Sequence, residues 1–128
     1  MLRIPRDLLE QTWRHLRSES PREGVGLWAG RLGQVSRVIP LPNVDPKPHQ
    51  NYQADPAELL QALWGLEAAG LELLAIYHSH PSGPARPSPA DRSKAYWPVP
   101  YVILALESGQ VRAYRLPQGE EVGVEVEG

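Results

Sequence analysis

The sequence predicts an α/β fold in which two main helices sandwich a central, mostly antiparallel mixed β-sheet, with a short third helix after a histidine-containing loop. Three observations predict it. Two stretches of the chain carry apolar residues at helical spacing. A hairpin pattern punctuated by glycine lies between them, and apolar runs of strand length follow the second. Such helices and strands bury their apolar faces most simply when the helices cover the two faces of one sheet.

The first part of the chain alternates strand, helix and hairpin. Residues 2–5 form an expected short strand, and helical spacing of apolar residues continues from there to about Ser20, where Pro21 ends the helix. The segments 23–31 and 34–41 combine small and apolar residues around a glycine turn. This pattern predicts a β-hairpin.

A second helix follows a proline-broken loop. Asp55 is the expected N-cap, Pro56 occupies the first helical position, and Gly70 ends the helix. Leucines at helical spacing mark its buried face, and Trp64 is expected in the core or in the wall of a groove. The apolar segment 71–80 then predicts a buried strand that enters a loop.

The last part of the chain contains a short helix and further strands. Ser88 opens the helix, which is expected to extend to about Tyr96. The segment 99–107 predicts a second buried strand, and a turn leads from it into the strand 110–117. The tail 119–128 alternates valine with glutamate or glycine, which predicts one last edge strand.

The composition excludes several kinds of chemistry. The 128 residues include no cysteine, which excludes a disulfide framework, a thiol nucleophile, a thiolate zinc site and an iron–sulfur cluster. The net charge is −2, so no nucleic-acid partner is expected. No apolar run approaches the roughly 20 residues of a membrane span, and early charges argue against a secretory signal. We therefore expect one cytoplasmic domain over residues 1–128, without a membrane contact.

Two histidines and an aspartate form the pattern with chemical content. His78 and His80 are two residues apart at the end of an expected strand, so their side chains point the same way. Asp91 follows at the start of the next helix, where it can close the site. Two imidazoles and a carboxylate suit Zn²⁺, and three protein ligands leave a fourth position for water, as in catalytic sites. The sequence therefore predicts one Zn²⁺ per chain.

Each piece of this pattern also has a structural interpretation. Histidines at strand ends are more often surface or hydrogen-bonded residues than ligands. Ser88 and Asp91 stand at the N-cap and third positions of an expected helix, where they can form a capping box. The pieces occur together in one loop between a buried strand and a helix, and this joint occurrence favours the metal site.

The same segment resembles the signature of the JAMM metalloprotease domain, also called JAB or MPN-plus. That signature is H-[ST]-H-P, six residues, then S-x-x-D, with an upstream glutamate in the form E-x-x-G-x-x-x-G. Glu23 opens such a segment, with Gly26 and Gly30 at the glycine positions. The resemblance extends over essentially the whole chain and implies a minimal prokaryotic member with the JAB1/MPN, cytidine-deaminase-like fold. The residues that match the main motif are His78, Ser79, His80, Pro81, Ser88 and Asp91.

The resemblance implies a role for each motif residue. His78, His80 and Asp91 would bind zinc. Glu23 would act as general base towards the attacking water and would later protonate the leaving amine. Ser88 would help to hold the oxyanion of the tetrahedral intermediate. The implied activity is that of a zinc metalloprotease, a deubiquitinase-like isopeptidase.

The resemblance also implies a substrate class. Family members with the complete motif cleave the bond between the C-terminal glycine of a ubiquitin-like protein and an amine. Only nine residues separate Asp91 from Tyr101, so the larger insertions that grip ubiquitin are absent or reduced. A small β-grasp protein of the sulfur-carrier type, ending in Gly-Gly, is therefore the expected substrate. Asn43, His49 and Tyr52 are weaker candidates for substrate contacts in the loop before the second helix.

Two other functions remain open from the sequence alone. Some relatives keep the fold, lose the metal ligands and act as scaffold or binding modules. A related bacterial group associated with DNA repair carries H-N-H-P-S-G, which this chain matches in part, with Ser79 in the asparagine position. The acidic net charge argues against that group. Edge strands that pair between chains would give a homodimer.

Overall fold

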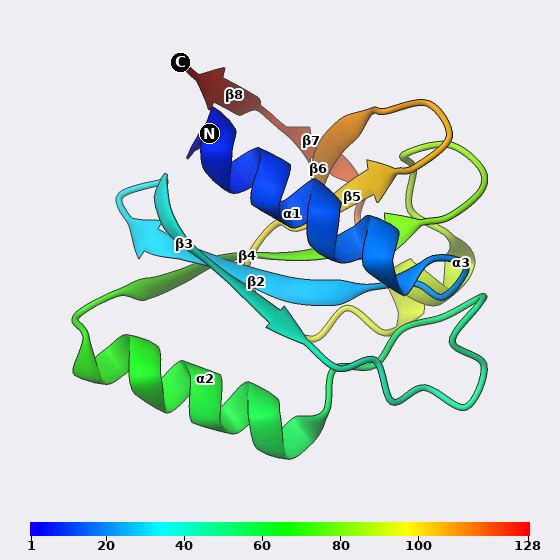
Figure 1. The fold of residues 1–128 in the computed structure, drawn as a ribbon, viewed down its shortest axis with the longest axis horizontal. Coiled ribbons are helices and arrows are strands. Elements are labelled where there is room, and N and C mark those ends of the chain that lie inside the picture. The colour runs from blue at the N-terminus through cyan, green and yellow to red at the C-terminus, as the bar shows by residue number, and fades with distance from the viewer.

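The structure, a computed structural model, describes all residues 1–128 and contains three helices and eight strands (Figure 1). None of the helices has the length and apolar character that a membrane crossing requires. In chain order the elements are β1 (Leu2–Pro5), α1 (Arg6–Glu19), β2 (Val25–Arg31), β3 (Gln34–Leu41), α2 (Pro56–Ala68), β4 (Glu72–His80), α3 (Pro89–Ser93), β5 (Tyr101–Ala105), β6 (Val111–Arg115), β7 (Glu120–Val122) and β8 (Val124–Glu127).

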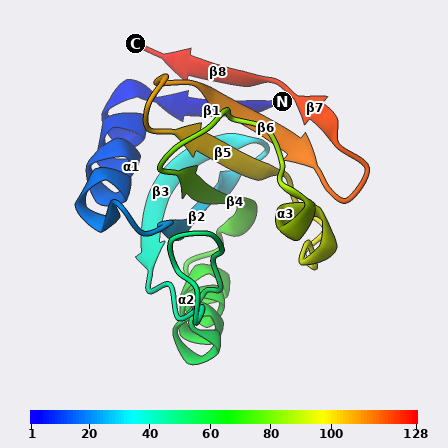
Figure 2. The same ribbon diagram turned by 90° about the vertical axis from the view of Figure 1, so that its right-hand side faces the viewer.

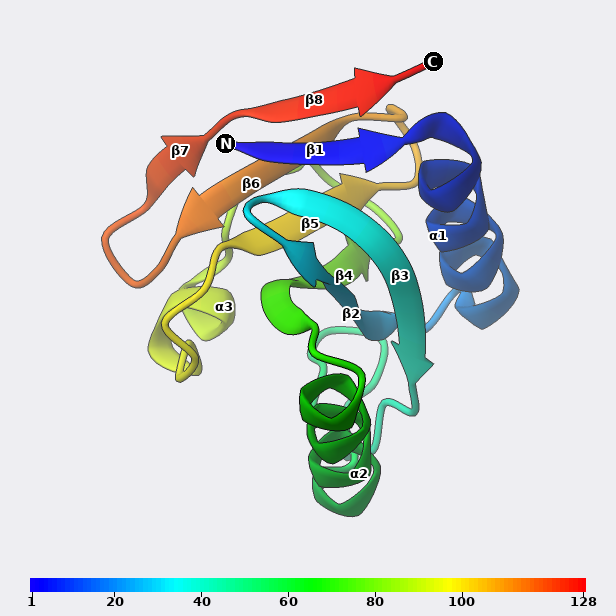
Figure 3. The ribbon, with the colours of Figure 1, turned by 90° about the vertical axis from the view of Figure 1, so that its left-hand side faces the viewer.

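All eight strands belong to one mixed sheet with the order β7-β6-β5-β4-β2-β3-β1-β8. The pairs β2–β3, β2–β4, β5–β6 and β6–β7 are antiparallel, whereas β1 runs parallel to β3 and β8, and β4 runs parallel to β5. Strands β7 and β8 lie at opposite edges, although only Gly123 separates them in the chain. The sheet must therefore curl until its edges approach each other, as Figure 3 shows.

The two long helices cover opposite faces of this sheet (Figure 2). Neighbouring residues of a strand point to opposite faces, and β2 shows the consequence. Trp28 packs with Leu9 and Leu16 of α1 in the larger apolar cluster. Leu27 belongs to a second cluster, against which Leu63 of α2 packs. Burial of each such side chain contributes roughly 1.5–3 kcal/mol, so both faces stabilise the fold. The predicted helix–sheet–helix sandwich is confirmed.

The expectation that Trp64 lies in the core or in the wall of a groove is wrong. The residue is 60% exposed and does not line the apolar groove beside α2, whereas Leu66 on the same helix is buried. Leu59, Leu63 and Leu66 lie three or four residues apart and form the face of α2 that meets the sheet. Trp64 follows Leu63 directly, so it is rotated about 100° away from that face.

Two boundaries near the C-terminus also differ from the prediction. The helix expected to reach Tyr96 ends at Ser93. Beyond it, the backbone N–H groups of Tyr96 and Trp97 donate to the Tyr101 hydroxyl (3.1 and 3.0 Å), which replaces helical hydrogen bonding. The tail forms two strands, β7 and β8, instead of one, because the curled sheet lets the chain cross from one edge to the other at Gly123.

Candidate metal centre and active site

The two histidines lie at the end of β4, where strands on both sides hold the backbone. Strand β4 pairs with β2 and β5 as far as His78 and His80. As residues i and i+2 of a strand, they point to the same face. Ser79 points the other way, and its Oγ accepts a hydrogen bond from the backbone N–H of Gly24 at 2.8 Å. This bond ties the end of β4 to the segment that carries Glu23.

Asp91 is positioned by the N-terminus of α3. The Ser88 Oγ accepts from the backbone N–H of Asp91 (3.0 Å), and the backbone N–H of Ser88 donates to Asp91 Oδ2 (2.9 Å). These reciprocal bonds form a capping box. The cap aims the Asp91 carboxylate at the end of β4, so the structural interpretation of this motif and the metal-site interpretation are compatible.

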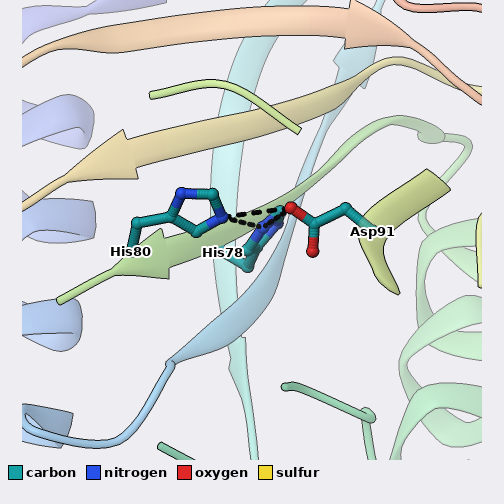
Figure 4. A group of neighbouring side chains, drawn as sticks. All are labelled: His78, His80 and Asp91. Atoms are coloured by element: carbon teal, nitrogen blue, oxygen red, sulfur yellow. Dashed lines mark hydrogen bonds and ion pairs between the residues drawn. The ribbon is translucent and has the colours of Figure 1, made fainter. Parts of the chain in front are cut away.

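Three ligand atoms converge between β4 and α3 (Figure 4). His78 Nε2 and His80 Nε2 lie 3.3 Å apart, and Asp91 Oδ2 lies 3.3 Å from the first and 3.0 Å from the second. Tetrahedral ligands at about 2.0–2.2 Å from a zinc ion are separated by roughly 3.3–3.6 Å. The triangle therefore has nearly the size that one face of such a tetrahedron requires.

Hydrogen bonding around His80 supports a cation within this triangle. The Nδ1 atom of His80 lies 2.9 Å from the carbonyl oxygen of Pro84, which can only accept. Nδ1 therefore carries a proton, and the neutral ring presents the lone pair of Nε2 to Asp91 Oδ2 and to His78. The lone pairs of these three atoms repel one another. A proton on one Nε2 can relieve the repulsion between two of the atoms, whereas a cation between all three relieves every pair. The residues fit a metal ion.

The ionisation states also suit a metal. Complete burial lowers the pKa of His78, which favours the neutral ligand form. Burial alone would raise the pKa of Asp91, but hydrogen bonds from His78 and His80 hold it well below its usual range. Burial opposes protonation of His80, yet its hydrogen bonds to Asp91 and to the carbonyl of Pro84, together with the charges of Asp91 and Glu23, outweigh burial and raise the pKa of that ring. Metal binding would displace this proton, so affinity should increase with pH.

Glu23 is a buried carboxyl group beside the metal ligands. Only 6% of the residue is exposed, and its Oε1 has no hydrogen-bond partner. Burial raises the pKa of Glu23 to about 8, and the nearby charges of His80 and Asp91 act on it with opposite signs. A bound dication would lower this pKa and favour the carboxylate. A carboxylate with a free oxygen in this position can exchange a proton with a reacting group.

The backbone of Glu23 is fixed by the loop between β3 and α2. Its N–H donates to the carbonyl oxygen of Pro48 (2.7 Å), and its carbonyl accepts from Asn43 Nδ2 (2.8 Å). The Asn43 amide also donates to Asn51 and accepts from the backbone N–H groups of Asp45 and Gln53. Its hydrogen-bonding capacity is thus used within the protein. Neither this role nor that of Ser79 was predicted, since Asn43 was expected to contact substrate only because its loop was expected to lie near the site.

The other two loop residues predicted to contact substrate lie in different environments. The Tyr52 ring stacks on the His78 ring, with centroids 4.2 Å apart. Tyr52 is therefore part of the site wall. His49 is exposed and makes no hydrogen bond to the rest of the chain. A further contact that the sequence did not reveal joins Asp45 Oδ2 of the same loop to Lys94 Nζ at 3.2 Å.

Two hollows border the metal centre. An apolar groove of about 500 Å³ lies on the α2 side, and its walls include Leu27, Tyr52 and Trp97. A pocket of about 890 Å³ lies towards β6 and β7, and His80 and Ser88 line it. A substrate whose scissile bond lies at the metal centre can therefore extend in two directions.

The chain is similar to proteins of one known family. The family described as prokaryotic homologs of the JAB domain matches residues 5–117. A probable TtuB-protein conjugate cleaving protease of Thermus thermophilus is 60% identical over 98% of this chain and 83% of its own length. A desampylase of Haloferax volcanii is 33% identical, covering 85% and 81%. The crystal structure of a JAB1/MPN domain protein from Archaeoglobus fulgidus shares the fold, with a TM-score of 0.67 at 24% identity over 98% and 97% of the two chains. The chain belongs to the family of prokaryotic JAB domains.

Proposed function

We propose that this protein is a zinc-dependent isopeptidase that hydrolyses the bond after the C-terminal Gly-Gly of a ubiquitin-like β-grasp protein. The observation that carries the proposal is the triangle of His78, His80 and Asp91, with edges of 3.0–3.3 Å, beside the buried carboxyl group of Glu23. Three ligands with a fourth position left open are typical of catalytic zinc. A scaffold protein would not need this convergence of buried polar groups, which is costly without a function.

The names of the relatives support the substrate class. The protein from T. thermophilus is named for cleaving TtuB–protein conjugates, and that from H. volcanii is named a desampylase. The geometry extends this support to particular residues, because His78, His80 and Asp91 converge, while Glu23 and Ser88 lie next to them. Zinc held by His78, His80 and Asp91 would activate a water molecule and polarise the scissile carbonyl.

Glu23 would move the protons of the reaction. Its free Oε1 would accept a proton from the attacking water, and Glu23 would then donate that proton to the departing nitrogen. The carbonyl carbon gains the hydroxyl, its bond to nitrogen breaks, and the products are a glycine carboxylate and an amine. The raised pKa of about 8 makes Glu23 able to hold a proton between the two steps.

Ser88 would stabilise the charge that develops on the carbonyl oxygen. Its Oγ accepts from the N–H of Asp91, so its hydroxyl hydrogen is free to donate elsewhere. Ser88 also lines the pocket next to the metal centre. In other hydrolases, an oxyanion donor of this kind lowers the activation barrier by about 2.7–4 kcal/mol.

The apolar groove is the natural place for the Gly-Gly tail. Tyr52, which stacks on His78, lines this groove together with Trp97 and Tyr101. An extended tail without side chains can approach the buried metal ligands, whereas a bulky residue would meet these rings. Replacement of the two substrate glycines by larger residues should therefore abolish cleavage.

The decisive experiment combines metal analysis with cleavage. Elemental analysis should find about one zinc per chain after loosely bound metal is removed. A β-grasp protein joined through its Gly-Gly end to a lysine side chain is the substrate, with release followed by mass spectrometry. Glu23→Gln should keep zinc and lose activity about 10²–10⁴-fold. The exposed Glu10 provides the control, since Glu10→Gln should change neither quantity.

The proposal is contradicted if no zinc binds after reconstitution at neutral pH, because the three ligands then do not act together. Full activity in Glu23→Gln would also contradict it, because the proposed mechanism needs the Glu23 carboxylate for both proton transfers.

A further inference from the structure

A basic pocket borders the metal centre on the side of β6 and β7, and the proposed mechanism leaves its charges unused. Its volume is about 890 Å³, and His80 and Ser88 form the part next to the metal ligands. Arg86, Arg92 and Arg112 line the same pocket. The whole chain carries a net charge of −2, so three guanidinium groups around one hollow are a local reversal of sign. Such a pocket favours anions.

The three arginines differ in how far their charges are already used. Arg92 donates to the backbone carbonyl oxygens of Pro117 and Gln118 (2.8 and 3.2 Å), which holds it in place without neutralising it. Arg112 pairs with Glu121 at 3.2 Å. Arg86 is exposed and has no hydrogen bond or ion pair within the chain. It is therefore the most available of the three for a ligand.

The loop that carries Arg86 is not free to turn away. The Tyr114 hydroxyl on β6 donates to the carbonyl oxygen of Ala85 at 2.6 Å, and Ala85 is fully buried. Tyr114 itself lines the pocket. The backbone next to Arg86 is thus anchored to the sheet, and only the side chain of Arg86 needs to adjust to a ligand.

Both the charge balance and the position indicate what the pocket accepts. The carboxylate of Glu121 lies in the pocket and would repel a polyanion, so a single anionic group fits better. The apolar groove on the other side of the metal centre suits the uncharged Gly-Gly tail. The basic pocket then remains for the other half of the substrate, which is the leaving amine.

We propose that this pocket binds a carboxylate carried by the leaving amine, as in an amino acid joined through its α-amino group to the Gly-Gly end, with Arg86 as the main contact. This inference rests on the proposed function and makes it more specific. Arg112 contributes a second contact when the ligand competes with Glu121 for its guanidinium group. The released amino acid keeps the carboxylate, while the new glycine carboxylate forms on the metal side.

The test compares matched peptides. Acetyl-Leu-Gly-Gly-Ala with a free carboxylate and the same peptide with a C-terminal carboxamide differ only in the proposed contact. The zinc-loaded protein should cleave the acid with a kcat/KM about tenfold higher than that of the amide. The preference should decrease as the sodium chloride concentration is raised, because the pocket is open to solvent. An equal or reversed preference overturns the inference.

Three variants separate this role from a structural one by the sign of their effects. Arg86→Gln should lower the acid-to-amide ratio about three- to tenfold. Glu121→Gln should raise it about two- to threefold, because Arg112 is then released. Arg37 on β3 is exposed and lies outside the pocket, so Arg37→Gln should leave the ratio unchanged. A decrease in both Arg86→Gln and Glu121→Gln would indicate a general disturbance and would overturn the assignment.

A binding measurement distinguishes failure of this inference from failure of the proposed function. Calorimetry with zinc-loaded Glu23→Gln protein should give tighter binding of the acid than of the amide, with the preference reduced when Arg86→Gln is added. Selective binding without cleavage by the wild type would contradict the isopeptidase and leave the pocket assignment supported. Cleavage of the acid and the amide without selectivity would support the isopeptidase and contradict the pocket assignment. A second pair of substrates, the acid and amide forms of a peptide linked through a lysine Nε atom, tests the position of the charge. If the acid is preferred over the amide only in this second pair, the α-carboxylate assignment is overturned.

Discussion

The metal ligands on β4 and the carboxyl group of Glu23 are held in place by different kinds of structure. His78 and His80 belong to a central strand with hydrogen-bonded neighbours on both sides. Glu23 precedes β2, and its backbone is held by bonds to Pro48 and Asn43 from an irregular loop. The two histidines are therefore held by the sheet, whereas Glu23 lies just outside it and depends largely on the loop between β3 and α2, with Gly24 bonded to Ser79. Changes to the two regions should affect metal binding and turnover separately.

The largest expected effect comes from removing a ligand. His80→Gln should reduce zinc affinity by more than the roughly 10–100-fold that loss of an outer hydrogen-bond partner causes, and cleavage should disappear with the metal. His15 on α1 provides a matched control, because His15→Gln removes an imidazole outside the site and should keep one zinc per chain. Elemental analysis and circular dichroism check the result. Retained zinc in a folded His80→Gln protein would show that the triangle is not the metal site.

The loop should give a large effect on turnover with little effect on metal. Asn43→Ala leaves the carbonyl oxygens of Glu23 and Asn51 and two backbone N–H groups without partners. We expect a loss of about 1–3 kcal/mol in unfolding free energy. We also expect kcat to fall about tenfold at unchanged zinc content, because the orientation of Glu23 is no longer fixed.

Asn51 is the control for this experiment, since its side chain makes no hydrogen bond and only its backbone N–H and carbonyl groups are used. Asn51→Ala should therefore retain kcat and stability. Equal kcat in wild type and Asn43→Ala, measured well below the melting temperature, would mean that the loop stabilises the fold without positioning Glu23.

The difference between the two regions also explains what could be predicted from the sequence. The ligands lie in one short segment, and strand alternation together with a helix cap is enough to bring them together. The hydrogen bonds of Asn43 and Ser79 join segments 20 and 55 residues apart, and no local pattern specifies such pairs. The exposure of Trp64 likewise depends on which face of α2 meets the sheet, which periodicity alone leaves ambiguous for a helix apolar on several sides.

A smaller effect is expected for stability of the metal-free protein as a function of pH. The folded-state pKa of Glu23 is about 8, above its unfolded value of 4.5, so the unfolded chain ionises first as pH rises. Glu23 therefore costs no stability below pH 4.5, and its cost grows between pH 4.5 and 8. Metal-free Glu23→Gln should be more stable than wild type at pH 8, by on the order of 1–3 kcal/mol, and equally stable near pH 4.5.

Urea unfolding of both metal-free proteins across this pH range measures the difference. Zinc should reduce it, because the dication stabilises the Glu23 carboxylate in the folded state. A difference that does not change with pH would indicate that Glu23 is not held in a buried, unpaired state.

The smallest effect concerns the ion pair between the loop and the segment after α3. Lys94 Nζ lies 3.2 Å from Asp45 Oδ2, but the lysine side chain is 52% exposed, so the pair should contribute less than about 1 kcal/mol. The pKa of Asp45 is lowered mainly by the backbone N–H of Lys47, and Lys94 adds to this effect. Lys94→Met should therefore destabilise the protein slightly at low salt and not at high salt. Lys47→Met should have a smaller effect, because the backbone of Lys47 makes its hydrogen bond to Asp45 and its ammonium group acts on Asp45 only through its charge. A loss above 2 kcal/mol in Lys94→Met would instead mean that the loop, and with it Glu23, depends on this single bridge.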